Sequence, residues 1–394
     1  MDPTKLRAWW FHRQGLDGRL RGASTAAVLA ETGWARSVGG IGPYLTLFAR
    51  NRASRESVDA AMADLEIHEL PSVRGCTYVL PADDFALALT AAEPFGAADM
   101  KVAYKLGVTD KEVAKLCDAV RKALEKGPLD PDGIRQATGN ASRSLGEAGK
   151  KKGLTTTLPL ALGKLQTDGE IRRVPVNGRL DQQRYRYCLW QPNPRRGFRM
   201  EAAEIAAELA RRYFRWIGPA TLAEFQWFSA LGAKAAKAAV EPLRLETLAG
   251  EDGLMLLPED RARWEAFRVP KQPRYALAAS LDGITLLKRN TKDVIDAADL
   301  KNALFRKKGY AGGNLADLPS HGIFDRGRLI GLWEYDLDSR SVAWASFVAR
   351  GKELTAAVEE TAEFVTAQLG DARSFSLDSP QSRKPRIEAL RAAP

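Results

Sequence analysis

Basic side chains gather in one stretch near the middle of the chain. They are Lys164, Arg172, Arg173, Arg179, Arg184 and Arg186. Two tyrosines, Tyr185 and Tyr187, alternate with the last of these arginines. Guanidinium and ammonium groups neutralise phosphates, and each phosphate contact adds about one unit to the salt dependence of binding. This chemistry predicts a surface that contacts the backbone of a nucleic acid.

The distribution of charge indicates the same stretch. Residues 143–200 hold thirteen Lys and Arg against four Asp and Glu, a net charge of +9, and the whole chain carries +10. Lys150, Lys151 and Lys152 form a run in this stretch and are included among the expected DNA contacts, although such runs are often only solvated loops. The alternative interpretation is a solvated basic face without a specific partner.

A helix and a hairpin are expected to position these side chains. Leu158, Leu162 and Leu165 recur at helical spacing within residues 155–169. Residues 170–190 then alternate like two strands around Asn177-Gly178, a dipeptide that readily takes the positive φ angles of a tight turn. A helix followed by an arginine-rich hairpin is typical of a winged helix, in which the helix enters a DNA groove and the wing meets phosphate.

Signatures of other chemistries are missing from the sequence. It contains no P-loop, no HExxH, no nucleophile elbow and no dinucleotide-binding loop, and we interpret GGIG at 39–42 as a turn that opens a helix. The three cysteines, Cys76, Cys117 and Cys188, form no CxxC pair, which argues against a zinc site or a disulfide framework. We therefore expect neither metal nor cofactor.

The histidines offer little for catalysis. His68 lies between Glu66 and Glu69, but neighbours along the chain do not converge without a special backbone. His321 is expected either to stabilise a turn or to face a cleft. The candidates for lining a cleft are Tyr44, Arg74 and His321.

The order of expected elements predicts an α+β fold, made mostly of helical tandem winged-helix (helix-turn-helix) domains with a small C-terminal antiparallel β-sheet or barrel. Four domains are expected: a first winged-helix-like unit, a second winged helix with the basic wing, a third winged-helix-like unit, and the sheet with a C-terminal helix and a basic tail. Their expected bounds are 1–108, 109–192, 193–270 and 271–394. Strand-like segments of the last domain are expected at 275–289, 320–337 and 341–350, with turns at Asp282-Gly283, Arg326-Gly327 and Asp338-Ser339. The basic tail at 379–394 is expected to pack loosely over its first part, 379–386.

The bulk properties point to a soluble protein. No apolar run reaches the roughly 18 residues of a membrane span, and the N-terminal residues lack the apolar core of a signal peptide. A cytoplasmic location is expected. Because several winged helices lie on one chain, a monomer is expected to cover DNA alone.

Four segments resemble a known family. They are PYLTLFAR (43–50), VRGCTYVLPADDF (73–85), GPATLAEFQWFSAL (218–231) and HGIFDRGRLIGLWEYD (321–336). In this order they are similar to the AlkZ/YcaQ-type winged-helix DNA glycosylases, and the likeness extends over residues 4–370. It implies tandem winged helices and a small β-barrel around a DNA-binding channel. It also implies metal-independent excision of bulky alkylated bases, above all N7-alkylpurines, and unhooking of interstrand crosslinks.

The catalytic signature of that family departs from its usual form here. The family carries Gln-hydrophobic-Gln or Gln-hydrophobic-Asp just upstream of the PYL-type helix, and counting back from Pro43 places it at Gly33, Trp34 and Ala35. Neither Gly nor Ala can hold a water molecule through a side chain. Glu31 would come into register with an alignment shift of two residues and is the weak catalytic candidate.

We therefore expect a duplex DNA-binding protein of the winged-helix glycosylase fold that recognises damaged or distorted DNA. One alternative is an active, metal-independent monofunctional DNA glycosylase that excises alkylated bases or unhooks crosslinks. A second is a winged-helix transcriptional regulator, and a third is a scaffold that binds a small molecule or a protein.

Overall fold

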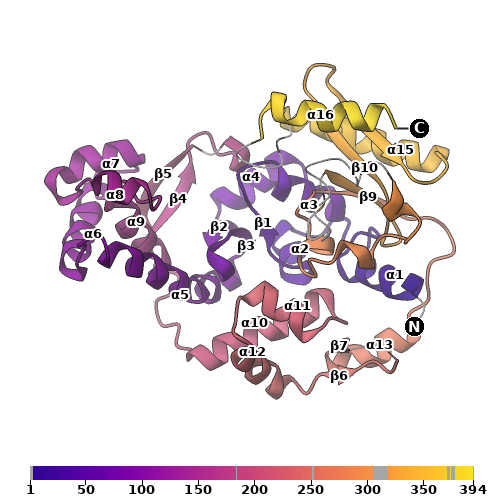
Figure 1. Cartoon of the computed structure of the whole chain (residues 1–394), viewed down its shortest axis with the longest axis horizontal. Coiled ribbons are helices and arrows are strands. Elements are labelled where there is room, and N and C mark those ends of the chain that lie inside the picture. The colour runs from indigo at the N-terminus through magenta and orange to yellow at the C-terminus, as the bar shows by residue number, and fades with distance from the viewer. Residues whose placement is uncertain are drawn as a thin grey trace. The chain divides into compact units, whose positions relative to one another are not determined.

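The computed structural model of the chain (Figure 1) divides into two compact units. Unit 1 comprises Met1–Ile67, Val79–Pro81 and Ala202–Pro394, and unit 2 comprises His68–Tyr78 and Ala82–Glu201. The structure describes residues 3–182, 184–250, 253–302, 304, 318, 320–370, 373 and 378–393. In chain order, unit 2 is thus inserted into unit 1.

A similar order of elements occurs three times along the chain: a helix, a short strand or bridge, two or three helices, and a two-stranded hairpin. After helix α1 (Pro3–Arg13), the first occurrence consists of α2 (Thr25–Thr32), β1 (Ala35–Arg36), α3 (Gly42–Asn51), α4 (Arg55–Ala63), β2 (Ile67–Pro71) and β3 (Thr77–Pro81). Its strands form a sheet in the order β1-β3-β2. The side chains of Ser24 and Ser54 cap α2 and α4 by accepting backbone N–H groups of the first turn.

The second occurrence lies in unit 2 and follows α5 (Phe85–Tyr104). It consists of α6 (Asp110–Leu124), α7 (Pro131–Thr138), α8 (Gly146–Lys150), α9 (Leu158–Thr167), β4 (Ile171–Pro175) and β5 (Tyr185–Leu189). Leu129 takes the place of the first strand, because its backbone N–H and C=O both pair with Tyr187 at 3.0 and 2.7 Å. Figure 1 shows α6 to α9 gathered at one end of the β4–β5 hairpin.

The core of unit 2 follows from helical periodicity. In α6 the buried residues Val113, Leu116, Val120 and Leu124 recur every three or four positions. They join the buried leucines of α9 and Ile171 of β4 in one apolar cluster. The base of the hairpin is therefore tied to the helices.

The third occurrence lies in unit 1 and has the same arrangement. It consists of α10 (Ala202–Ile217), α11 (Leu222–Ser229), α12 (Ala233–Val240), β6 (Glu246–Thr247) and β7 (Met255–Leu256), followed by α13 (Arg261–Ala266). Ala220 pairs with Met255 in the position that Leu129 and Tyr187 occupy in the second occurrence. Thr221 and Glu224 form a capping box at the start of α11. Three helix-turn-helix segments, each completed by a hairpin, are thus present, as the sequence predicted.

The C-terminal part of unit 1 is built on an antiparallel sheet in the order β11-β10-β9-β8. Its strands are β8 (Tyr275–Ala278), β9 (His321–Asp325), β10 (Arg328–Asp336) and β11 (Ser341–Ser346), and α15 (Lys352–Phe364) follows, continued by a π-helical turn at Val365–Leu369. The strand expected at 275–289 is wrong in its second half, which forms the short helix α14 (Gly283–Leu286). The cause is Asp282, whose carboxylate accepts the backbone N–H of Ile284 and so starts a helix.

The expectation that the first part of the tail, 379–386, packs loosely is also wrong. Residues Pro380–Arg391 form helix α16, which packs against β10 and β11 and lies along the sheet in Figure 1. Ile387 and Leu390 are three residues apart and enter the apolar core of the sheet. Arg386 pairs with buried Glu334 at 2.9 Å. Helical spacing of two apolar residues thus anchors an otherwise polar segment.

These elements confirm the predicted fold class, a mostly helical α+β protein with small antiparallel sheets. Within the described residues, no helix is both long and apolar enough to cross a membrane.

Candidate nucleic-acid interface

The β4–β5 hairpin of unit 2 has one basic face that is turned away from the core. Arg172 pairs in register with Cys188, and Val174 pairs with Arg186. Directly paired residues and their second neighbours share a face of an antiparallel sheet, so these four side chains lie on one side. Arg172 is half-buried and Arg186 is exposed. Arg184, which lies just before β5, is also exposed. None of the four paired residues on this face is acidic.

On the opposite face of the hairpin, the basic side chain of Arg173 is paired with groups of unit 2 itself. Tyr187 packs against the core, and the guanidinium of Arg173 lies 5.0 Å from the centre of the Tyr185 ring and 3.8 Å from the carboxylate of Glu69. Burial raises the pKa of Tyr185, and the charge of Glu69 adds to the rise. Arg173 is therefore a structural cation, although the sequence grouped it with the DNA contacts.

The turn of the hairpin holds a second internally paired arginine. The Nε and Nη2 atoms of Arg179 donate to the two oxygens of Asp181 at 3.0 and 2.6 Å, and Asp181 is buried. The predicted turn at Asn177-Gly178 is present, and of its two residues Gly178 has the positive φ angle (76°). Its geometry is further fixed because Asn177 accepts the backbone N–H of Arg179.

Helix α9 offers a narrow surface of its own. Five of its residues are buried, because both α5 and α6 pack against it, and Pro159, Gly163 and Lys164 are exposed. Lys164 donates to Asp168 at 2.9 Å, which raises its pKa. The expected recognition helix therefore contributes less open surface than the hairpin beside it.

The three consecutive lysines lie at the end of α8 and in the turn that follows. Lys150, Lys151 and Lys152 are exposed, and Lys150 lies 3.8 Å from Glu147. Among the expected DNA contacts, the side chains with open cationic groups are thus Lys151, Lys152, Arg184 and Arg186, with Arg172 partly open.

The residues placed at the family's catalytic signature lie in unit 1 and are structural. Gly33 ends α2 with a φ angle of 107°, where a Cβ atom would come within 3.3 Å of the Trp216 ring. Trp34 is buried against the rings of Trp216 and Phe228, and Ala35 is buried in β1. None of the three presents a polar side chain to solvent.

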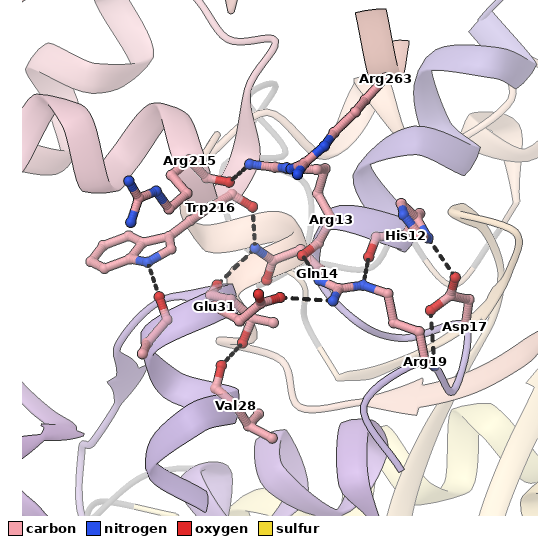
Figure 2. Close-up of polar contacts among 12 residues, drawn as sticks. His12, Arg13, Gln14, Asp17, Arg19, Val28, Glu31, Arg215, Trp216 and Arg263 are labelled. Carbon is pink, nitrogen blue, oxygen red and sulfur yellow. Dashed lines mark hydrogen bonds and ion pairs between the residues drawn. The ribbon is translucent and has the colours of Figure 1, made fainter. Parts of the chain in front are cut away.

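Glu31 differs from its neighbours because its side chain is half-exposed (53%). Arg19 donates to its carboxylate at 2.7 Å, as Figure 2 shows. The next residue, Thr32, is buried and donates its hydroxyl back to Val28 at 2.8 Å. In this segment the carboxylate of Glu31 is the polar group best placed to meet a ligand.

A buried glutamine that the sequence did not single out holds this segment in place. The amide nitrogen of Gln14 donates to the carbonyls of Thr32 and Trp216 at 2.8 and 2.9 Å (Figure 2). Its oxygen accepts from Arg50 at 2.9 Å, and Arg50 forms a fully buried ion pair with Asp282. Gln14 thereby fixes the end of α2 to the end of α10.

Glu31 lines a pocket of about 370 Å³. Its polar lining consists of Arg13, Arg19, Glu31, Arg215, Glu259, Asp260 and Arg263. We name it the arginine pocket. Its arginines are distant from one another in the sequence, so no local pattern could have revealed them.

Of the three residues expected to line a cleft, Tyr44 and His321 are buried in the core. Tyr44 is buried and donates to Asp59 at 2.6 Å. His321 is buried against the Trp333 ring and accepts the backbone N–H of Ser280, and burial lowers its pKa to about 3. Neither side chain opens to solvent, whereas Arg74 is half-buried with a φ angle of 63°.

Among the described residues, no group of three or more His, Cys, Asp or Glu side chains is arranged to hold a metal ion. His68 is buried in unit 2 between the rings of Phe85 and Trp190. Burial lowers its pKa to about 3, helped by the charges of Arg172 and Arg173. It is therefore a neutral core residue.

The chain is similar to a known protein in its fold and to a known family in its sequence. No curated protein matches its sequence. The solved structure of Streptomyces sahachiroi DNA glycosylase AlkZ matches with a TM-score of 0.68 and 20% sequence identity, over 94% of this chain and 97% of that one. The sequence model described as DNA glycosylase AlkZ-like matches residues 40–369, a range that begins after Glu31 and Gly33. With most of its length matched and the same fold, the chain belongs to the AlkZ-like DNA glycosylase family.

Proposed function

We propose that this protein binds duplex DNA through the outward face of the β4–β5 hairpin and the neighbouring lysines, and that it prefers damaged or distorted DNA. The observation that supports this proposal is the contrast between the two faces of the hairpin. Arg173 and Arg179 pair with buried carboxylates, whereas Arg184 and Arg186 are exposed. The preference for damaged DNA rests on membership of the AlkZ-like DNA glycosylase family.

The open charges of this surface set the size of its electrostatic contribution to binding. The outward residues are Arg172, Arg184, Arg186, Lys151 and Lys152. If each met one phosphate, log K would fall by about 4.5 per unit of log salt, since each contact contributes about 0.9. Binding dominated by these contacts should therefore be tight at low salt and weak at high salt.

The test compares three proteins on one duplex of about 20 base pairs by fluorescence anisotropy, a length that exceeds the footprint of a single winged helix. They are the wild type, the triple variant Arg172→Ala, Arg184→Ala, Arg186→Ala, and the control Arg135→Ala. Arg135 is also exposed in unit 2, but it lies on α7 and pairs with Asp132. We expect the triple variant to bind much more weakly and the control to bind like the wild type. Equal affinities of all three proteins would overturn the proposal.

Lesion preference is measured in the same assay with a duplex that carries one bulky N7-alkylguanine. Tighter binding to that duplex than to the intact one supports damage recognition. A strong preference for one undamaged sequence would instead support a transcriptional regulator.

A second candidate function is excision of the damaged base with Glu31 as the acting carboxylate. The observation that favours it is the position of Glu31 on the wall of the arginine pocket, held by Arg19. A carboxylate can activate a water molecule or stabilise the cationic sugar that forms when the base departs. Gly33 and Ala35 can do neither.

Base release from the lesion duplex tests this candidate. Glu31→Gln should abolish release, whereas Glu259→Gln, which removes a carboxylate from the same pocket, should leave most of it. Release that survives in Glu31→Gln would exclude Glu31, and absence of release from the wild type would leave a binding-only protein.

A further inference from the structure

We infer that the arginine pocket of unit 1 is a binding site for a phosphate group. Its four arginines come from separate elements. Arg13 ends α1, Arg19 lies in the turn between α1 and α2, Arg215 is in the last turn of α10, and Arg263 is in α13. Figure 2 shows Arg19 beside Glu31, Arg13 and Arg263 close to each other, and the side chain of Arg215 extending away from these three. The fold therefore brings guanidinium groups together that the sequence keeps far apart.

The carboxylates of the pocket do not balance these arginines. Arg19 pairs with Glu31 at 2.7 Å. Asp260 is shared, at 3.0 Å from Arg13 and 3.6 Å from Arg263. With Glu259 included, four guanidinium groups face three carboxylates. The pocket thus has an excess of one positive charge, which a phosphodiester would neutralise.

One guanidinium of the pocket is open to a ligand. Arg215 is exposed, and within the described part of the chain its side chain makes neither a hydrogen bond nor an ion pair. Its carbonyl oxygen, by contrast, accepts from Arg13. The backbone at Arg215 is therefore held at the pocket while its charged group is left unpaired.

Arg13 is a second guanidinium of the pocket whose donors are not all satisfied. Its side chain is 12% exposed, and its buried Nε makes no hydrogen bond within the described structure. Burial lowers the pKa of this guanidinium despite its contact with Asp260, and the nearby charges of Arg19 and Arg263 lower it further. A bound anion would offset this crowding of like charges.

The chemistry of the donors selects the ligand. Guanidinium groups match the geometry of phosphate oxygens and donate to them in pairs. The phosphate could belong to the DNA backbone or to a free phosphate ester. The DNA source rests on the proposed function, whereas the pocket's affinity for phosphate does not.

The experiment uses the full chain as the wild type and as three single variants, two in the pocket and one control. Arg215→Ala and Arg263→Ala remove exposed side chains of the pocket. Arg211→Ala removes an arginine of the same helix that pairs with Glu208 and does not line the pocket. Far-UV circular dichroism confirms that each variant is folded. Duplex binding is measured by anisotropy at several salt concentrations, and binding of inorganic phosphate is measured by calorimetry.

If the pocket holds a DNA phosphate, each pocket variant should lower the salt slope by about 0.9 and weaken duplex binding about eightfold at about 0.1 M salt. Arg211→Ala should change neither quantity. If the pocket holds a free phosphate ester, duplex binding is unchanged, but inorganic phosphate binds the wild type and Arg211→Ala and not the two pocket variants.

Two results separate this inference from the proposed function. If no phosphate binds and both pocket variants bind duplex like Arg211→Ala, the phosphate site is refuted, even when the hairpin variant shows that DNA binding stands. If the wild type does not bind duplex at all, the proposed function fails, and the calorimetric comparison still decides whether the pocket takes phosphate.

Discussion

Replacing Asp282 by Ala should destabilise unit 1 severely. Asp282 and Arg50 are fully buried, and the Nη1 and Nη2 atoms of Arg50 donate to the two carboxylate oxygens at 2.7 and 2.8 Å. Asp282 also accepts the hydroxyl of Thr46 and the backbone N–H of Ile284. The variant leaves the Arg50 charge buried without its counter-charge, which costs about 3–5 kcal/mol in comparable cases.

A double variant separates the cost of an unpaired buried charge from the net contribution of the ion pair to stability. In the double variant Arg50→Met, Asp282→Leu, no charge is left buried, and apolar groups of similar size fill the space. Such replacements are often neutral or stabilising. The remaining cost is the lost cap of α14, about 1 kcal/mol. The double variant should therefore be clearly more stable than Asp282→Ala.

Urea unfolding followed by tryptophan fluorescence measures these differences, because Trp9, Trp10 and Trp216 are buried in unit 1. The ion pair also supports the segment that carries Glu31. Arg50 donates to Gln14, and Gln14 in turn donates to the backbone carbonyl of Thr32. A loss below about 1 kcal/mol for Asp282→Ala, or a double variant as unstable as the single one, would refute the reasoning from an uncompensated charge.

Three further predictions concern stability. Because the pKa of His68 is lowered to about 3, the unfolded chain binds the proton first as the pH falls, so stability is lost between about pH 6.5 and 3 at about 1.4 kcal/mol per pH unit. Between pH 6.5 and 5, the free energy of unfolding measured in urea should fall by about 2 kcal/mol less in His68→Phe than in the wild type. An unchanged pH dependence would contradict a neutral, buried His68. Thr221→Ala breaks the capping box with Glu224 and should cost about 1 kcal/mol in the same assay, whereas Thr221→Ser should cost little. Ile387→Ala removes a buried anchor of α16 and should cost about 2–4 kcal/mol; a loss near zero would mean that α16 is not held by this contact.

Much of the fold could be predicted from local patterns. Leu158, Leu162 and Leu165 predicted a helix, and α9 contains all three in its buried part. The Asn177-Gly178 turn and the alternation on either side of it predicted β4 and β5. These features depend on neighbours a few residues away, so a single sequence reveals them.

The failures of prediction have a common cause in distant contacts. The tail was expected to be loose because residues 379–386 are polar, yet Ile387 and Leu390 find an apolar sheet to pack against. The pairing of Arg173 with Glu69 and of Arg19 with Glu31 also joins residues that are not adjacent in sequence. For this reason the sequence overestimated the open charge on the hairpin and did not reveal the arginine pocket.

The salt dependence of duplex binding by the wild-type protein tests the central claim most directly. Affinity for an intact duplex is measured by anisotropy between about 50 and 200 mM salt, because log K falls linearly with log salt when phosphate contacts drive binding. The outward residues of the hairpin and the neighbouring lysines predict a slope of log K against log salt between about −3 and −5. Binding that is micromolar or weaker at the lowest salt, with a slope near zero, would contradict the account of this surface as a DNA-binding one.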